Sequence, residues 1–271
     1  MAAKLKVSVV TVCYNCVKDI EQTMQSVLGQ TYENIEYIVI DGGSTDGTVD
    51  IIRKYADRID YWVSEPDKGI YDAMNKGIAH ATGDYINFMN AGDNFVSNET
   101  LENCFGENEY DADIIYGNAI YNYGDFKLLF KPKALSLFPK RFPISHQASF
   151  VRTSIMKDCP YDPAYKSSAD YDFFLKRYRA KDKFHYLPIA IAEFEAETGI
   201  SSSQILLRRK ECGIINGLGG GVKYRLVSHC INLKYRIRHN LQKLFPTLVS
   251  EIRRKKLIKA GSEEISLSPT V

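Results

Sequence analysis

Short runs of β-branched residues alternate with helical stretches from residue 6 to residue 89, and this alternation restricts the fold more than any other feature. Strands are predicted at 6–13, 35–40, 61–63 and 85–89, and helices at 18–28, after the turn 42–47 as far as residue 55, and at 70–81. Strands connected in this way through right-handed crossovers form a parallel sheet covered by helices. We therefore expect an α/β fold.

From residue 112 the alternation loosens into shorter pieces. Strands are predicted at 114–116, 119–123, 126–130, 146–151 and 184–192, and helices at 170–178, 204–216 and 224–258. The first of these pieces suggest an antiparallel addition to the parallel sheet. A run of three glycines at 219–221 is a natural hinge, so we predict a main domain over 1–218 and a helical tail over 219–271.

Polar residues follow three of the predicted parallel strands. Tyr14 and Asn15 follow the first strand, Asp41 ends the second, and 90–93 (Asn-Ala-Gly-Asp) follow the fourth. The carboxyl ends of parallel strands meet at one edge of a sheet, and ligands of open α/β sheets bind there. The sequence therefore predicts one ligand site built from several strand ends.

Five segments, in this order along the chain, resemble the motifs of the family 2 glycosyltransferases. They are 9–15 (VVTVCYN), 41–47 (DGGSTDG), 65–77 (EPDKGIYDAMNKG), 83–93 (GDYINFMNAGD) and 169–172 (ADYD). The similarity extends over about 6–195. It implies a GT-A-type fold, in which a nucleotide-binding, mostly parallel sheet is flanked by helices and joined to a smaller antiparallel acceptor part. Within this family, the chain resembles transferases of the bacterial polysaccharide or colanic-acid type.

The resemblance implies an inverting transfer of a sugar from a nucleotide-diphosphate donor, with UDP favoured, to a hydroxyl of a saccharide or lipid-linked saccharide. It implies a nucleotide site formed by Thr11, Tyr14, Asn15, Asp41, Asp67, Lys68, Asp72, Asn90, Ala91 and Gly92. The residue types suit this role, because a carboxylate can accept a hydrogen bond from a nucleobase N–H and an aromatic ring can stack on the nucleobase. The Lys68 ammonium can pair with a diphosphate.

Asp93 is the implied ligand of Mn²⁺ or Mg²⁺, which would neutralise the leaving diphosphate. Asn90 stands where the family usually has an acid, and Gly92 where a second Asp is common. Asp93 is therefore the only carboxylate of the segment 90–93, and we expect a weaker metal site than the family norm.

Asp170 is implied as the general base that takes the proton from the acceptor hydroxyl. Asp172 is its nearest competitor, but residues two apart on a helix point in different directions. His146 and Gln147 resemble a His-Gln pair that would reach the diphosphate or the acceptor, and Asp172 is assigned to the same acceptor or diphosphate side. A neutral histidine can donate to a phosphate or accept a proton.

Each of these residues also has a purely structural interpretation. Asp41 with its glycines can be only a turn, Asp170 or Asp172 can cap a helix, and Tyr14 can belong to the core. Two other functions compete with transfer. A sugar-nucleotide nucleotidyltransferase needs a glycine-rich basic phosphate loop after the first strand, which 14–16 (Tyr-Asn-Cys) is not, and a non-catalytic sugar-nucleotide binding protein would bind the donor without turnover.

Residues 222–271 hold 11 Lys or Arg against three Glu, although the whole chain has a net charge of only +2. Apolar residues interleave with these charges, which is typical of a helix that lies on an anionic membrane. No nucleic-acid motif accompanies the charge, so we expect no nucleic-acid partner. No apolar run reaches the length of a membrane span, and we expect a cytoplasmic protein that can lie on the inner face of the inner membrane.

Six cysteines are scattered along the chain, and two of them form a C-x-x-C motif at Cys13 and Cys16. This spacing suits a redox pair or half of a zinc site. A zinc site would need a second pair at ligand spacing, which the sequence lacks. We expect all six cysteines to be free thiols.

Overall fold

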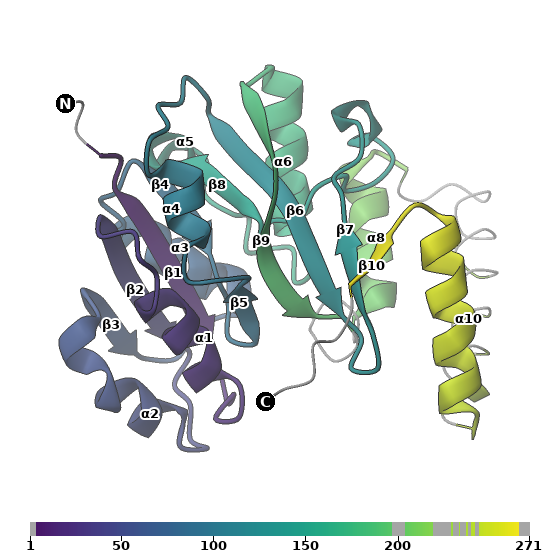
Figure 1. The fold of residues 1–271 in the computed structure, drawn as a ribbon, viewed down its shortest axis with the longest axis horizontal. Coiled ribbons are helices and arrows are strands. Elements are labelled where there is room, and N and C mark those ends of the chain that lie inside the picture. Colours follow the sequence, from purple (N-terminus) through teal and green to yellow (C-terminus); the bar gives the residue numbers. More distant parts are fainter. Residues whose placement is uncertain are drawn as a thin grey trace.

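A computed structural model describes residues 4–196, 204–218 and 244–265, together with the single positions 229, 233, 237, 240 and 241. The strands of this part form one twisted sheet covered by helices (Figure 1). The strands are β1 (Val7–Cys13), β2 (Ile35–Asp41), β3 (Tyr61–Ser64), β4 (Tyr85–Phe88), β5 (Asp93–Phe95), β6 (Ile114–Asn122), β7 (Lys127–Phe130), β8 (Ser149–Arg152), β9 (Phe184–Glu195) and β10 (Glu263–Ile265).

Helices connect and cover these strands. They are α1 (Ile20–Leu28), α2 (Thr48–Lys54), α3 (Ile70–His80), α4 (Thr100–Phe105), α5 (Thr153–Asp158), α6 (Ala169–Ala180), α8 (Ile205–Ile215) and α10 (Pro246–Lys259). Two short 3₁₀ turns occupy Ala56–Arg58 and Leu135–Leu137. The α/β class predicted from the sequence is confirmed.

The first half of the sheet is parallel, as predicted. Its order is β3-β2-β1-β4, and β1 pairs in parallel with both β2 and β4. The register places Cys13 opposite Asp41, so the loops that follow β1 and β2 leave the sheet side by side. The polar residues after these strands therefore lie at one edge, as the strand order requires.

The second half is mostly antiparallel. β8 pairs antiparallel with β4 and β6, and β6 pairs antiparallel with β7. β9, however, runs parallel to β6, with register shifts between Tyr116 and Ala119. The two strands predicted at 114–116 and 119–123 are one strand with an irregularity at Gly117, where a Cβ atom would lie 2.5 Å from the Ile191 side chain.

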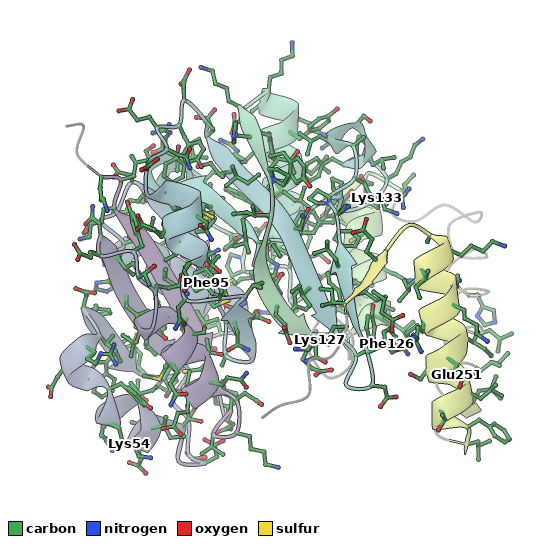
Figure 2. The ribbon with its side chains drawn as sticks, in the orientation of Figure 1. Lys54, Phe95, Phe126, Lys127, Lys133 and Glu251 are labelled. Carbon is green, nitrogen blue, oxygen red and sulfur yellow. The ribbon has the colours of Figure 1, made fainter. Side chains whose placement is uncertain are left out.

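Several elements differ from the prediction for local reasons. The strand predicted at 146–151 begins only at Ser149, because 145–148 form a turn. β5, which pairs with β9, has only three residues and carries the polar pair Asp93 and Asn94, so no alternation marks it. Its last residue, Phe95, is buried in the core (Figure 2). The helices α4 and α5 have six residues each, too few for a helical period to show.

Both faces of the parallel sheet are buried, so its strands are apolar on both sides. In β1, Val7 and Val9 face the side covered by α1 and α2, whereas Val10 and Val12 face the side covered by α3 and α6. Gly77 of α3 packs directly on Val10, because a Cβ atom there would lie 2.4 Å from a valine methyl. This contact sets the distance of α3 from the sheet.

The C-terminal segment returns to the sheet. α10 begins with Pro246 at its first turn, a position that suits proline, and β10 then pairs antiparallel with β7 (Figure 1). Lys131 Nζ lies 2.6 Å from Glu263 Oε1. The predicted helix 224–258 is described mainly through α10, and the predicted hinge 219–221 lies outside the described residues. In the described part of the chain, none of the helices combines the length and the apolar character that a membrane span needs.

Candidate active site

Asp41 ends β2 and is fully buried. Its Oδ2 accepts hydrogen bonds from the backbone N–H groups of Gly43 (3.1 Å) and Ser44 (2.8 Å) and from the Ser64 hydroxyl (2.6 Å), and its Oδ1 accepts from the Ser44 hydroxyl. Burial alone would raise the pKa of Asp41, but these donors outweigh it and lower the pKa. Asp41 is therefore ionised and holds the loop 42–47 in place. The N–H of a nucleobase must replace or join one of these donors to bond to Asp41.

Tyr14 lies above Asp41 and is 63% exposed, so the structural interpretation of Tyr14 as a core residue is wrong. A Cβ atom on Gly42 would lie 2.4 Å from Asp67 Oδ2 and 3.3 Å from Tyr14 Cδ2. The absence of a side chain at Gly42 thus lets an aromatic ring and a carboxylate meet at the edge of the sheet. This arrangement suits a flat polar ligand that stacks on the ring.

Asn15 connects the loops that follow β1 and β2. It adopts a left-handed conformation with φ 47°, its N–H donates to Ser44 Oγ (2.7 Å), and its Oδ1 accepts from the Thr45 N–H (3.0 Å). Asn and Asp tolerate this conformation better than most residues. Through these hydrogen bonds, Asn15 fixes the loops that follow β1 and β2 next to Tyr14.

Thr11 does not line the site. Its side chain is fully buried inside the sheet, where its hydroxyl donates to the Met89 carbonyl (2.8 Å) and lies 3.0 Å from the Tyr37 hydroxyl. The prediction that Thr11 contacts the nucleotide is wrong, because residue 11 sits two positions before the strand end and faces the core.

Asp67, Lys68 and Asp72 lie together at the start of α3. The Asp67 carboxylate accepts from the Gly69 N–H (2.7 Å), and Asp72 accepts from the Lys68 N–H (3.0 Å). Lys68 is exposed, and its carbonyl accepts from Lys166 Nζ (3.1 Å). Two ammonium groups therefore lie near this loop. Lys166 was not predicted as a site residue, because it belongs to none of the motifs.

The turn 90–93 follows β4 and is fixed by three hydrogen bonds. The Ala91 N–H donates to the Val12 carbonyl (3.1 Å), the Gly92 N–H to Thr23 Oγ1 (2.9 Å), and the Asp93 N–H to the Asn90 carbonyl (2.8 Å). Gly92 has φ 96°, a conformation that favours glycine. This geometry explains why a glycine, rather than a second Asp, fits at that position.

The Asp93 carboxyl is half-buried, and burial raises its pKa to about 7, although the charge of His146 and a hydrogen bond with the Gln147 side chain act in the opposite direction. Asn90 Oδ1 is buried and makes no hydrogen bond within the described part of the chain. A divalent cation would satisfy both groups, since carboxylate and amide oxygens are ligands that Mg²⁺ and Mn²⁺ accept. The residues present therefore fit such a cation.

The protein alone does not complete a metal site. Within the described ranges, three or more His, Cys, Asp or Glu side chains do not gather in a metal-binding arrangement. Further ligands would have to come from a bound diphosphate or from water, as is usual for Mg²⁺ at phosphate sites.

Asp170 lies in the first turn of α6, beside His146. His146 Nδ1 is 3.3 Å from Asp170 Oδ2, and the Tyr71 hydroxyl donates to Asp170 Oδ1 (2.9 Å). Burial alone would raise the pKa of Asp170, but the hydrogen bond and charge of His146 and the Tyr71 hydroxyl lower it. Burial alone would lower the pKa of His146, but Asp170, and then the charge of Asp93, raise it. His146 Nε2 is buried and makes no hydrogen bond within the described residues.

Asp172 faces away from this cluster. Its Oδ2 pairs with Lys176 Nζ at 2.6 Å, one helical turn further along α6. The expectation that Asp170 and Asp172 point in different directions is confirmed. Gln147 lies next to His146, where its carbonyl accepts from Asn87 Nδ2 (2.9 Å) and its Oε1 from the Ser145 hydroxyl (2.8 Å).

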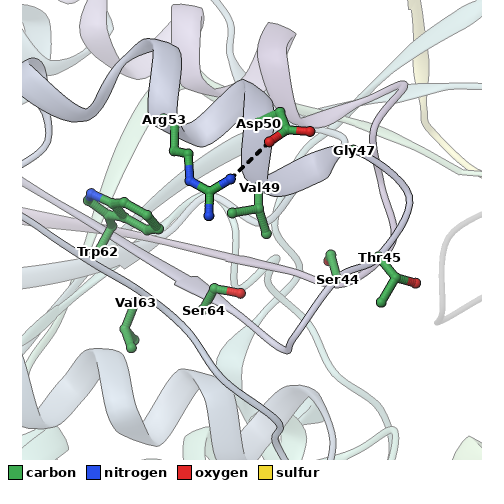
Figure 3. A pocket seen from close by; sticks show the side chains of 9 residues that line it. All are labelled: Ser44, Thr45, Gly47, Val49, Asp50, Arg53, Trp62, Val63 and Ser64. Carbon is green, nitrogen blue, oxygen red and sulfur yellow. Dashed lines mark hydrogen bonds and ion pairs between the residues drawn. The ribbon is translucent and has the colours of Figure 1, made fainter.

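A groove of about 580 Å³ lies beside Asp41, between α2 and the outer strand β3 (Figure 3). It is lined by Ser44, Thr45, Gly47, Val49, Asp50, Arg53, Trp62, Val63 and Ser64. Two of these residues, Ser44 and Ser64, also hold Asp41. The groove therefore adjoins the Tyr14 end of the site rather than the Asp170 end.

The comparisons with known proteins decide the family. The model of the family described as "Glycosyl transferase family 2" matches residues 8–173, which contain the Tyr14, Asp93 and Asp170 regions. The chain belongs to glycosyl transferase family 2. The resemblance of its five motifs to this family is thereby confirmed.

The relatives of this family 2 glycosyltransferase include an uncharacterized glycosyltransferase of Mycobacterium tuberculosis, 34% identical over 190 residues, which cover 65% of this chain and 70% of that protein. A second is the PGL/p-HBAD biosynthesis glycosyltransferase of Mycobacterium bovis, 30% identical over 197 residues, which cover 66% of this chain and 73% of that protein. Both alignments support the same family.

Solved structures support the fold. TarS 1-349 of S. aureus in complex with UDP-GlcNAc has a TM-score of 0.62 at 20% identity, over 78% of this chain and 66% of that one. The mannosyltransferase PcManGT of Pyrobaculum calidifontis, in complex with GDP-Man and Mn²⁺, has a TM-score of 0.60 at 14% identity, over 96% of this chain and 81% of that one. The predicted GT-A-type architecture is confirmed. The chain spans 39% of the longer TarS chain.

Proposed function

We propose that this glycosyltransferase moves a sugar from a nucleotide-diphosphate donor, with UDP favoured, to a hydroxyl of a saccharide or lipid-linked saccharide, with inversion at the anomeric carbon. The observation that supports this most is the position of Asp170, an ionised and half-buried carboxylate whose Oδ2 lies 3.3 Å from His146 Nδ1, while the charge of Asp93 also acts on His146. The proposed base and the proposed cation-binding carboxylate would thus act in the same site.

The donor would extend along the edge formed by the strand ends. Its base would stack on the exposed ring of Tyr14 near Asp41 and Asp67, and its diphosphate would lie near Lys68 and the turn 90–93. A bound Mn²⁺ or Mg²⁺, held by Asp93 with the Asn90 amide oxygen, would neutralise the charge of the leaving diphosphate. Asn15, Ala91, Gly92 and Asp72 would act by holding the loops in place.

Asp170 would take the proton of the acceptor hydroxyl as its oxygen bonds to the anomeric carbon. The bond from that carbon to the diphosphate oxygen breaks in the same displacement, and the electron pair leaves with the diphosphate. A single displacement inverts the configuration and needs one base. His146 would orient Asp170, and its free Nε2, with Gln147, would face the diphosphate or the acceptor. Asp172, paired with Lys176, would act only on the structure of α6.

The choice of donor and acceptor draws on the relatives. TarS binds UDP-GlcNAc and PcManGT binds GDP-Man with Mn²⁺, so both uridine and guanosine donors deserve a test. The relative in Mycobacterium bovis is named a PGL/p-HBAD biosynthesis glycosyltransferase, which supports a biosynthetic role, and the acceptor class rests on the resemblance of the motifs. No nucleic-acid partner is proposed.

The C-terminal segment is proposed to contact an anionic membrane surface on the cytoplasmic side. In α10, the exposed side chains Leu248 and Ile252 precede the basic run 253–256, and the exposed Ile258 follows it. Exposed apolar side chains among cations favour the interface of an anionic bilayer. Co-sedimentation with vesicles of phosphatidylglycerol and phosphatidylcholine, compared with phosphatidylcholine alone, tests this contact.

The function is tested with a panel of UDP-, GDP- and dTDP-sugars, with Mn²⁺, with Mg²⁺ or with EDTA. We expect transfer or hydrolysis of a UDP-sugar with metal and loss of turnover with EDTA. Release of pyrophosphate from a nucleoside triphosphate and a sugar phosphate would instead indicate a nucleotidyltransferase. Donor binding without turnover, at any metal concentration and with acceptor saccharides present, would indicate a non-catalytic binding protein.

A further inference from the structure

Tyr71 is a buried tyrosine in the first turn of α3, and the residue is only 7% exposed. Its hydroxyl donates to Asp170 Oδ1 at 2.9 Å, although the two residues are 99 positions apart in the chain. His146 Nδ1 approaches the other oxygen, Oδ2, at 3.3 Å. The Asp170 carboxylate is therefore held at both oxygens by groups from two different segments.

We propose that Tyr71 is a positioning residue that fixes the Asp170 carboxylate for proton transfer and ties it to the donor-binding segment. This inference rests on the proposed function, in which Asp170 is the general base. Tyr71 itself does not touch the reacting atoms, so it acts through Asp170.

Two contacts on opposite oxygens prevent the carboxylate from rotating. A general base is effective only within hydrogen-bonding reach of the proton that it takes, and a fixed plane leaves the remaining lone pairs of Asp170 in a constant direction. The Tyr71 hydroxyl also donates to the ionised form of Asp170, which a donor stabilises. Its removal would make the carboxylate both less ordered and more basic.

Tyr71 also links the base to the donor side of the site. α3 begins directly after the loop in which Gly69 donates to Asp67 and Lys68 donates to Asp72. Tyr71 is therefore carried by the same short segment as the proposed donor-binding side chains. A shift of this loop would move the Tyr71 hydroxyl and with it the Asp170 carboxylate.

Other titratable groups also face Asp170. His146 comes from the turn before β8, and Tyr161 from the segment after α5. The charge of Asp170 raises the pKa of Tyr161, where burial is the main cause, and of Cys212 on α8, where burial is again the main cause. Asp93 acts on the same cluster through His146. A variant at Tyr71 must therefore be compared with a change at one of these neighbours.

Tyr161→Phe is the matched control. The ring centroids of Tyr71 and Tyr161 lie 5.4 Å apart in the same aromatic cluster, and both residues are buried. Tyr71→Phe removes the hydroxyl that bonds to Asp170, whereas Tyr161→Phe removes a hydroxyl from the same cluster and leaves that bond in place. Both variants keep their rings and thus the packing.

For Tyr71→Phe we expect kcat to fall about tenfold, the size of effect expected when a hydrogen bond to a charged group is lost. The affinity for UDP should not change. The acid limb of the pH profile of kcat, measured at saturating donor and metal, should move to higher pH, because Asp170 loses a donor to its ionised form. Tyr161→Phe should match the wild type in all three measurements.

A second measurement does not depend on turnover. The imidazole of His146 is titrated by NMR in the wild type, in Tyr71→Phe and in Tyr161→Phe, and its midpoint should move to higher pH only in Tyr71→Phe, where the carboxylate is more basic. An unchanged His146 titration together with an unchanged acid limb would overturn the proposal, as would equal shifts in Tyr161→Phe. If the wild type turns over no nucleotide sugar, the proposed function fails, and the NMR titration still decides whether Tyr71 acts on Asp170.

Discussion

Replacement of Asp93 by Asn should stabilise the ligand-free protein at alkaline pH while it removes the cation-binding carboxylate. The pKa of Asp93 is raised from 3.8 to about 7, chiefly by burial. A carboxyl with a raised folded-state pKa binds its proton more tightly in the folded state. At low pH, Asp93 therefore does not reduce the free energy of unfolding. The reduction grows as pH rises from about 4 to 7 and is then constant.

The size of this cost follows from the shift. At about 1.4 kcal/mol per pKa unit, a rise from 3.8 to about 7 corresponds to about 4 kcal/mol as an upper limit. Asp93 is only half-buried, and solvent screening reduces the effect. We therefore expect Asp93→Asn to gain about 2 kcal/mol at pH 8 and close to zero at pH 4.

The assay is urea unfolding of wild type and variant at pH 4, 6 and 8, in EDTA and again in Mn²⁺. In EDTA the difference in free energy of unfolding should open between pH 4 and pH 8. Mn²⁺ should stabilise the wild type at pH 8 and leave Asp93→Asn unchanged, because binding to the folded state alone adds stability. Asp50→Asn, a change at an exposed carboxylate, is the control. A difference between wild type and Asp93→Asn that does not vary with pH would refute the reasoning.

Three further predictions concern other parts of the site and the sheet. Tyr14→Ala should weaken UDP binding about tenfold, the value of one base stack, without changing the melting temperature, since Tyr14 is 63% exposed; unchanged binding in calorimetry would contradict it. Gly42→Ala should also weaken UDP binding, because its Cβ would lie 2.4 Å from Asp67 Oδ2, and a crystal structure would show Asp67 displaced. Glu36→Gln should cost about 2 kcal/mol of stability at pH 7. The pKa of Glu36 is lowered to about 2 by Ser8, Thr82 and Lys6 against the effect of burial, so this contribution is present above pH 4.5 and is lost as pH falls toward 2, and urea unfolding at pH 7 and pH 3 checks it.

The parallel half of the sheet could be predicted because its signals are local. The strands β1, β2 and β4 are mostly apolar and almost entirely buried, and the crossover helices α1 and α3 are long enough to show a helical period. The antiparallel half was less predictable. β9 pairs in parallel with β6 across a register shift, and β5 has three residues, so no periodic pattern specifies either pairing.

Some site residues could likewise be predicted from local motifs, whereas others are brought to the site only by tertiary contacts. Asp41, Asp93 and Asp170 could be found because each lies in a motif at a strand end or a helix start. Thr11 belongs to the same motif as Tyr14, but alternation in β1 turns its side chain into the core. Tyr71 and Lys166 reach the site only through tertiary contacts, over 99 and 98 positions respectively, and the sequence does not contain that information. Tyr71 nevertheless stands inside the motif 65–77, which was the one available signal.

The central claim is that Asp170 is the base of a sugar transfer from a nucleotide donor, and one comparison tests it most directly. Turnover of a UDP-sugar with Mn²⁺ and binding of UDP are measured for the wild type, Asp170→Asn and Asp172→Asn. We predict that Asp170→Asn binds UDP as the wild type does but loses about 10²- to 10⁴-fold in kcat. Asp172→Asn, which loses only the pair with Lys176, should keep turnover within a few fold. Wild-type turnover in Asp170→Asn, or a greater loss in Asp172→Asn, would contradict the claim.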